Sequence, residues 1–67
     1  MWKIAVKILD REREYVLPED FFSYNDARDY TIHLSRLGIW IVENSHLAVF
    51  YPPHSIRNFV VREIIDS

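Results

Sequence analysis

The chain has 67 residues, of which 49% are hydrophobic and 15% aromatic, and its formal net charge is −2. This composition is too apolar for a disordered segment, and the sequence lacks the run of lysines or arginines typical of general nucleic-acid binding. It contains no cysteine, which excludes disulfides and thiolate zinc sites and is compatible with a reducing cytoplasm.

Alternation at the N-terminus predicts a first strand over residues 2–9. Two lysines interrupt its apolar residues, so we expect neither a signal peptide nor a membrane span. Residues 15–17 predict a short second strand, which Pro18 ends. The face of the first strand that carries the larger apolar side chains contains Trp2, Ile4, Val6 and Ile8.

The period changes from two to that of a helix at Ser23. Ser23 and Asp26 have the spacing of a capping box, and acidic residues nearby suit the positive end of a helix dipole. Gly38 predicts the end of the helix, because glycine readily adopts the left-handed helical conformation that often follows the last turn. The apolar stripe of this helix is predicted to contain Ala27, Tyr30, Leu34 and Leu37.

Two β-rich runs, 39–43 and 46–51, flank Asn44 and Ser45 and predict a hairpin with a tight turn. Two prolines then interrupt the pattern, and 59–65 predicts a last strand. The expected fold is a single α+β domain over 1–67, of order β-(β)-α-β-β-β, with one helix packed on a mainly antiparallel sheet.

Both faces of this hairpin are predicted to be apolar. A two-residue turn at Asn44 and Ser45 pairs Glu43 with His46, and it places Ile39, Ile41, Ala48 and Phe50 on one face. A single short helix cannot cover both faces of the sheet, and domains this small often gain stability by oligomerising. We therefore expect a homo-oligomer, and the opposite face supplies the expected interface residues: Trp40, Val42, Leu47 and Val49. The alternative is that the first and last strands and the loops cover both faces.

Residues 51–58 are the most distinctive candidate for ligand or partner binding. Two prolines present an aromatic, an imidazole, a hydroxyl and a guanidinium within one short stretch. The simpler interpretation is a strand connection in which Pro53 begins a single helical turn. The candidate binding residues are Tyr51, His54, Ser55 and Arg57 from this stretch, together with Trp40 and Arg36.

No motif in the sequence predicts catalysis or a cofactor. His33, His46 and His54 lack any short metal-ligand spacing, and the single glycine precludes a phosphate-cradling loop. Ser55 beside His54 is not a nucleophile signature, because no glycine elbow accompanies it. We expect no enzyme activity, no metal and no cofactor.

The expected function is that of a small cytoplasmic, homo-oligomeric protein that regulates or inhibits an unknown partner protein by surface binding. The small size, the high aromatic content and the lack of cysteine look like those of accessory proteins of phages and mobile elements, by composition only. The alternative is a protein that sequesters a small nucleotide-like anion between subunits. Trp40 or Tyr51 would then stack on a base, and Arg36, Arg57 or His54 would hold phosphate.

Overall fold

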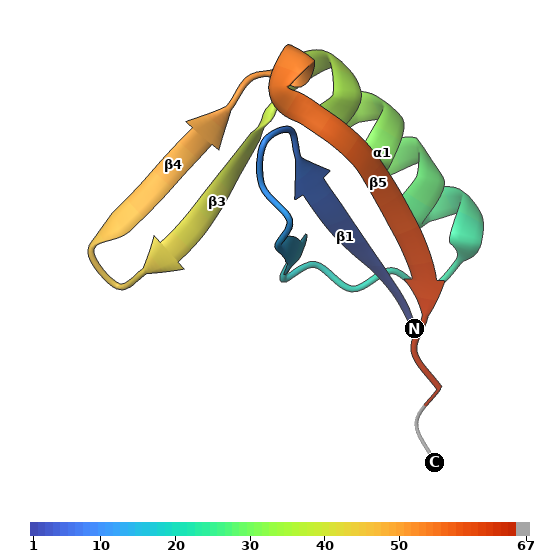
Figure 1. Ribbon diagram of the computed structural model, residues 1–67. Coiled ribbons are helices and arrows are strands. Elements are labelled where there is room, and N and C mark those ends of the chain that lie inside the picture. The colour runs from blue at the N-terminus through green and yellow to red at the C-terminus, as the bar shows by residue number, and fades with distance from the viewer. Residues whose placement is uncertain (66–67) are drawn as a thin grey trace.

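The computed structural model describes residues 1–65 and has the predicted α+β class (Figure 1). The last two residues of the predicted domain, 66 and 67, lie outside the described part. The helix and strands follow the predicted order, and a 3₁₀ turn at Pro53 matches the simpler interpretation of residues 51–58. The elements are β1 (Trp2–Ile8), β2 (Glu14–Val16), α1 (Tyr24–Leu37), β3 (Ile39–Asn44), β4 (Leu47–Tyr51), η1 (Pro53–Ser55) and β5 (Ile56–Glu63).

The strands form two antiparallel sheets instead of one. Strand β1 is the centre of a three-stranded sheet of order β2-β1-β5, and β3 and β4 form a separate hairpin. The alternation of β1 gives it one buried face, because Ile4 and Val6 are fully buried there while Lys3 and Lys7 lie on the other face. In Figure 1 the hairpin projects away from the three-stranded sheet and the helix.

Helix α1 begins and ends where the sequence predicts. The Ser23 hydroxyl accepts a hydrogen bond from the Asp26 backbone N–H at 3.1 Å, and the Gly38 N–H donates to the Leu34 carbonyl at 2.8 Å. Gly38 has φ 86° and ψ −180°, a conformation that is positive in φ but is not the left-handed helical one expected. Leu37, the last residue of the predicted stripe, is 58% exposed. The stripe therefore ends at Leu34, and Tyr30 and Leu34 pack against the core.

The predicted register of the hairpin is wrong by one residue. The Asn44 side-chain oxygen accepts the His46 N–H at 2.8 Å, so the turn forms at Ser45 and His46 and β3 extends through Asn44. An irregularity between Val42 and Asn44 takes up the extra residue. As a result Trp40 pairs with Phe50, Ile41 with Val49, and Val42 with Ala48.

The last strand also differs from its predicted limits. It begins at Ile56, three residues before the predicted start at Phe59, because η1 is only three residues long and the Ile56 N–H closes it on the Pro53 carbonyl. It pairs with the whole of β1, from Trp2 opposite Glu63 to Ile8 opposite Ile56.

The core lies between the inner face of the three-stranded sheet, α1 and one face of the hairpin. It contains Ile4, Val6, Ile8, Tyr15, Leu17, Ala27, Ile39, Ile41 and Tyr51. The Cα radius of gyration is 12.1 Å, against about 11 Å for a compact domain of this length. The helix of the described region is not long and apolar enough to span a membrane.

Candidate functional site

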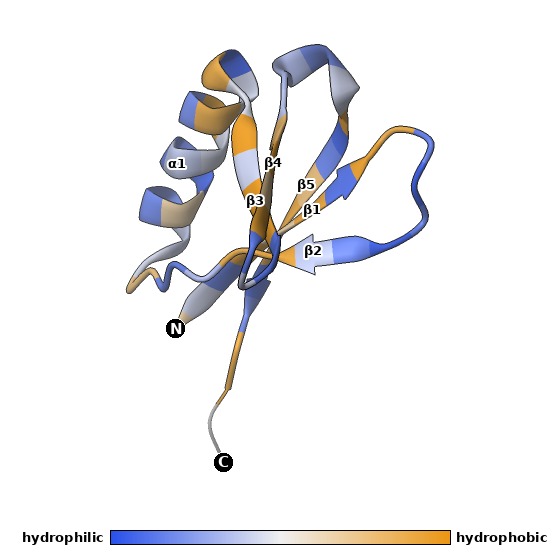
Figure 2. Ribbon diagram, turned by 90° about the vertical axis from the view of Figure 1, so that its left-hand side faces the viewer, coloured by the Kyte–Doolittle hydropathy of each residue, from blue (hydrophilic) through white to orange (hydrophobic). Residues whose placement is uncertain are grey.

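The corrected register gathers four apolar side chains on the outer face of the hairpin. We call the set Trp40, Val42, Ala48 and Phe50 the outer hairpin face. All four are exposed: Val42 is 73% exposed, Trp40 67% and Phe50 42%. No charged residue belongs to this set, and Figure 2 shows hydrophobic residues along both strands of the hairpin. Exposed apolar area concentrated on one face of a sheet is typical of an interaction surface.

Two of the predicted interface residues lie on the other face. Leu47 and Val49 alternate with Ala48 and Phe50 along β4, so they share the side of the hairpin that carries Ile41 and Tyr51. Val49 is half-buried there against the core. Leu47 is 52% exposed. Trp40 and Val42 keep the exposed position that the sequence predicted for them.

An aromatic pair shapes the outer hairpin face at its base. The rings of Trp40 and Phe50, which are directly opposite across the two strands, have centroids 5.3 Å apart at an interplanar angle of 53°. The Phe50 ring also lies against Gly38, where an added Cβ would be 2.7 Å from its Cζ. The backbone at the end of α1 therefore packs against the Phe50 ring of this pair.

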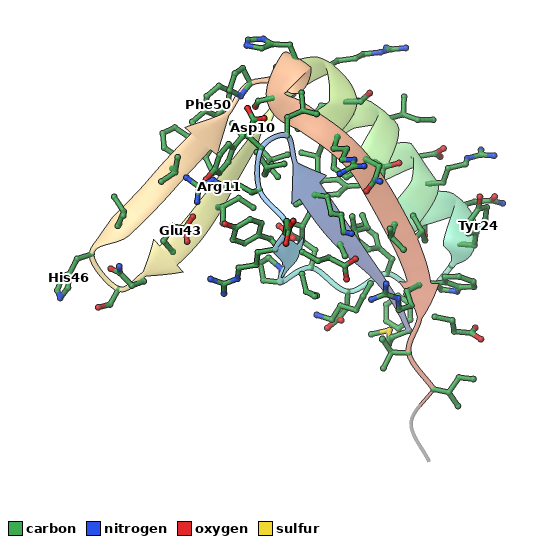
Figure 3. All side chains as sticks on the ribbon, viewed as in Figure 1. Asp10, Arg11, Tyr24, Glu43, His46 and Phe50 are labelled. Carbon is green, nitrogen blue, oxygen red and sulfur yellow. The ribbon has the colours of Figure 1, made fainter. Side chains whose placement is uncertain are left out.

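The inner side of the hairpin is attached to the sheet by a polar cluster. The Glu43 carboxylate accepts hydrogen bonds from the hydroxyls of Tyr15, at 3.5 Å, and Tyr51, at 3.4 Å. The guanidinium of Arg11 lies 5.8 Å from the Tyr51 ring centroid, and that of Arg13 lies 5.1 Å from the Tyr15 ring. We call these five residues the tyrosine clasp. Figure 3 shows Arg11 and Glu43 between the hairpin and the β1–β2 connection.

The clasp also changes the acidity of one tyrosine. Burial raises the pKa of the Tyr51 hydroxyl above its ordinary value of 10.0; the nearby Arg11 opposes this rise, and Tyr15 and Glu43 add to it. The neutral hydroxyl is the form that donates to Glu43. At neutral pH the clasp therefore holds the inner face of the hairpin toward the sheet, which leaves the outer face directed to solvent.

The structure separates the residues predicted for ligand binding. Tyr51 is buried, with its hydroxyl on Glu43, so its ring belongs to the clasp. The Ser55 hydroxyl donates to the Pro52 carbonyl at 2.8 Å. The other three candidates from the basic residue types are exposed on three different elements, and none of the ion pairs among residues 1–65 includes them: Arg36 in the last turn of α1, His54 in η1 and Arg57 in β5.

Sequence reasoning missed the clasp and the role of Phe50. The clasp joins residues far apart in the chain, and alternation alone does not identify which charged side chain reaches a buried tyrosine. One signal was available: a tyrosine at an inward position of a strand needs a partner for its hydroxyl, and Glu43 is the only acid in the hairpin.

Comparison of the chain with protein-family models, with curated proteins and with solved structures found no match in any of the three. Within residues 1–65, no three or more histidine, aspartate or glutamate side chains are grouped so that they could hold a metal ion.

Proposed function

We propose that this chain is a non-enzymatic protein-interaction domain that associates with a second copy of itself through the outer hairpin face. The observation that carries the proposal is the simultaneous exposure of Trp40, Val42, Ala48 and Phe50 on one uncharged face. In water such a face favours contact with another apolar surface.

The size of the face supports a second copy as the occupant. The four side chains expose roughly 400 Å² of mostly apolar area, as judged from typical side-chain areas. Two copies packed face to face would cover about twice that area, and with the rim they reach the lower end of specific interfaces, near 1,000 Å². The expected association is therefore weak, with dissociation in the micromolar range.

The proposed contact is a two-fold one, in which the same face of each copy meets that of the other. A two-fold axis through the pair Val42 and Ala48 would place the Trp40 ring of each protomer near the tip of the other hairpin. Sheets that pack face to face interdigitate their side chains at a spacing of about 10 Å. The exposed small Ala48 opposite Val42 leaves room for a large side chain of the second copy.

Ala48→Glu is the test of this interface. It places a charge at the centre of the face and removes no packed side chain, so we expect self-association to weaken at least tenfold. The measurement is the solution mass by light scattering or sedimentation between about 1 and 500 µM.

Leu47→Glu is the matched control, because it changes the neighbouring exposed residue on the other face of the same strand. The control should associate as the wild type does. A wild type that is monomeric at the highest concentration, or equal weakening in the two variants, contradicts the proposed interface.

We further propose that the assembled protein acts in the cytoplasm as a regulator or inhibitor of a partner protein. The lack of cysteine supports this location, and the open shape with a second candidate surface, described below, supports the binding role.

A further inference from the structure

A groove separates the hairpin from the rest of the molecule. Its volume is about 880 Å³, within the range of binding sites for small ligands and short peptides. One wall is formed by Gly38–Val42 at the end of α1 and along β3. The opposite side is formed by residues 13–19, which include all of β2, and by Tyr30 and Leu34 of α1.

The β3 wall of the groove is an unpaired strand edge. Within residues 1–65, β3 pairs only with β4, so its other edge has no strand partner. Five consecutive residues of this wall line the groove, including side chains from both faces of the strand, so the backbone edge itself borders it. No strand among residues 1–65 pairs with the N–H and C=O groups on this edge, so another extended backbone can bind them. The edge is about 17 Å long, enough for a five-residue partner strand.

The opposite wall limits what can bind this edge. A second copy would present β3 already paired with β4, which is a sheet two strands wide. Strand β2 and helix α1 stand across the groove, so a lone extended segment fits the space better than another sheet. Two copies are therefore expected to meet at the outer hairpin face and not at this edge. Trp40 and Val42 belong both to that face and to the groove lining, so the two surfaces share two residues of β3.

The groove lining indicates the chemistry of such a segment. Most of the lining side chains are apolar, and they include Leu17, Tyr30, Leu34, Ile39 and Ile41. The charged residues of the lining are Arg13, Glu14 and Glu19. Arg13 lies over the Tyr15 ring, and Glu14 pairs with Arg62 at 3.1 Å.

Glu19 supplies the negative charge of the groove. It accepts a hydrogen bond from the Tyr30 hydroxyl at 3.5 Å, and no cation of residues 1–65 lies within 4.0 Å of it. Glu19 is exposed, so a Lys or Arg of the bound segment can reach its carboxylate.

We propose that the groove binds an extended segment of a partner protein, which adds as a strand to the free edge of β3. The segment has apolar side chains at alternate positions and a Lys or Arg that pairs with Glu19. Main-chain hydrogen bonds to β3 supply affinity, and the apolar lining with Glu19 supplies selectivity. This site goes beyond self-association: it shares Trp40 and Val42 with the outer hairpin face, but its hydrogen bonds are to the free backbone edge of β3.

The test starts from a random octapeptide display library selected on the purified wild-type protein. The expected winners alternate apolar residues with others and carry Lys or Arg at one position. A synthetic winner should bind with a micromolar Kd, and its affinity should fall as salt rises. A selection that enriches no such pattern overturns the proposal.

Backbone N-methylation of the synthetic peptide distinguishes strand addition from other modes of binding. Because only alternate amides of an added strand face β3, methylation at every second residue should weaken binding at least tenfold, and methylation at the intervening residues should leave it unchanged. On the protein, alternate amides among residues 38–42 should gain protection from hydrogen exchange when the peptide binds. Equal effects at all peptide positions contradict the proposal.

Two protein variants complete the experiment. Glu19→Lys should weaken peptide binding at least tenfold, and the matched reversal Glu12→Lys, which lies in the β1–β2 connection outside the groove lining, should leave it unchanged. Ala48→Glu should still bind the peptide although its self-association is weakened, so failure of one proposal is distinguishable from failure of the other. Loss of binding in Glu12→Lys as large as in Glu19→Lys overturns the role of Glu19.

Discussion

Gly38 permits the close approach of helix α1 and the hairpin. Its φ of 86° with ψ near 180° is a conformation that essentially only glycine adopts, and a Cβ there would lie 2.6 Å from the Tyr51 carbonyl oxygen. We therefore expect Gly38→Ala to lower the free energy of unfolding by about 2 to 4 kcal/mol, measured by urea titration.

Gly38→Asn is the informative companion variant. Asparagine tolerates the left-handed helical region but not this conformation, and it carries the same Cβ. It should be destabilised at least as much as the alanine variant. Recovery of stability with Asn would mean that positive φ alone, and not the contact with Tyr51 and Phe50, requires glycine here.

Tyr51 makes the free energy of unfolding depend on pH in the alkaline range. Because its pKa is raised in the folded state, the folded protein holds this proton more tightly than the unfolded chain. The contribution is complete below the ordinary value of 10.0 and is lost as pH rises through the raised pKa. We expect the free energy of unfolding to fall above about pH 10 and the fall to be smaller in Tyr51→Phe.

Tyr30 is a second source of the same dependence, because burial and the nearby Glu19 raise its pKa as well. The residual fall in Tyr51→Phe is therefore expected to be smaller than that of the wild type but not zero. Denaturant titrations at intervals from pH 8 to 11.5 measure it. Identical curves for the wild type and Tyr51→Phe would contradict the assignment.

At the scale of elements, the start of α1 depends on one side chain. The Ser23 hydroxyl accepts the Asp26 N–H, which otherwise has no partner in the first turn. Ser23→Ala should lower the free energy of unfolding by about 1 kcal/mol. Ser35→Ala in the same helix serves as the control and should change it by less than about 0.5 kcal/mol, because its hydroxyl bonds to the Ile32 carbonyl, which already belongs to the helix.

The elements themselves were predictable because their signals are local. Alternation marked β1, and Ser23 and Gly38 marked both ends of α1. The register of the hairpin was not predictable in the same way. The Asn44 side chain accepts a hydrogen bond from the His46 N–H, and the turn forms one residue later than predicted. The pairing of β4 with β3 shifts by one residue as a result, so that Phe50 and not Val49 lies on the exposed face.

Of the outer hairpin face, the sequence placed the two β3 residues together but not the two β4 residues, because only the β4 residues depend on the turn. Trp40 and Val42 share one exposed face, as alternation along β3 predicts, and their role as interface residues stays a prediction. Leu47 and Val49 were placed on the wrong face because their side depends on the turn. The separation of the strands into two sheets, and the groove between them, depend on contacts between distant residues such as Tyr15 and Glu43.

For the whole molecule, self-association predicts a melting temperature that depends on concentration. The proposed dimer would form only from folded chains, so mass action would stabilise the fold as protein is added. We expect the wild-type Tm to rise by about 5 °C for a hundredfold increase in concentration. Differential scanning calorimetry or fluorescence can follow this rise, and it should vanish in Ala48→Glu. A concentration-independent Tm in the wild type is incompatible with a folded-state dimer in that range.

The pairing of β1 with β5 sets the order in which the molecule can assemble. The hairpin joins neighbours in the chain and can close within microseconds, whereas the central strand must wait for a partner more than forty residues away, from Ile8 opposite Ile56 to Trp2 opposite Glu63. Before β1 pairs with β5, the hairpin has no three-stranded sheet and no tyrosine clasp to pack against, so both of its apolar faces are exposed to solvent. We therefore expect the chain to be more prone to aggregation before β5 pairs with β1 than after it.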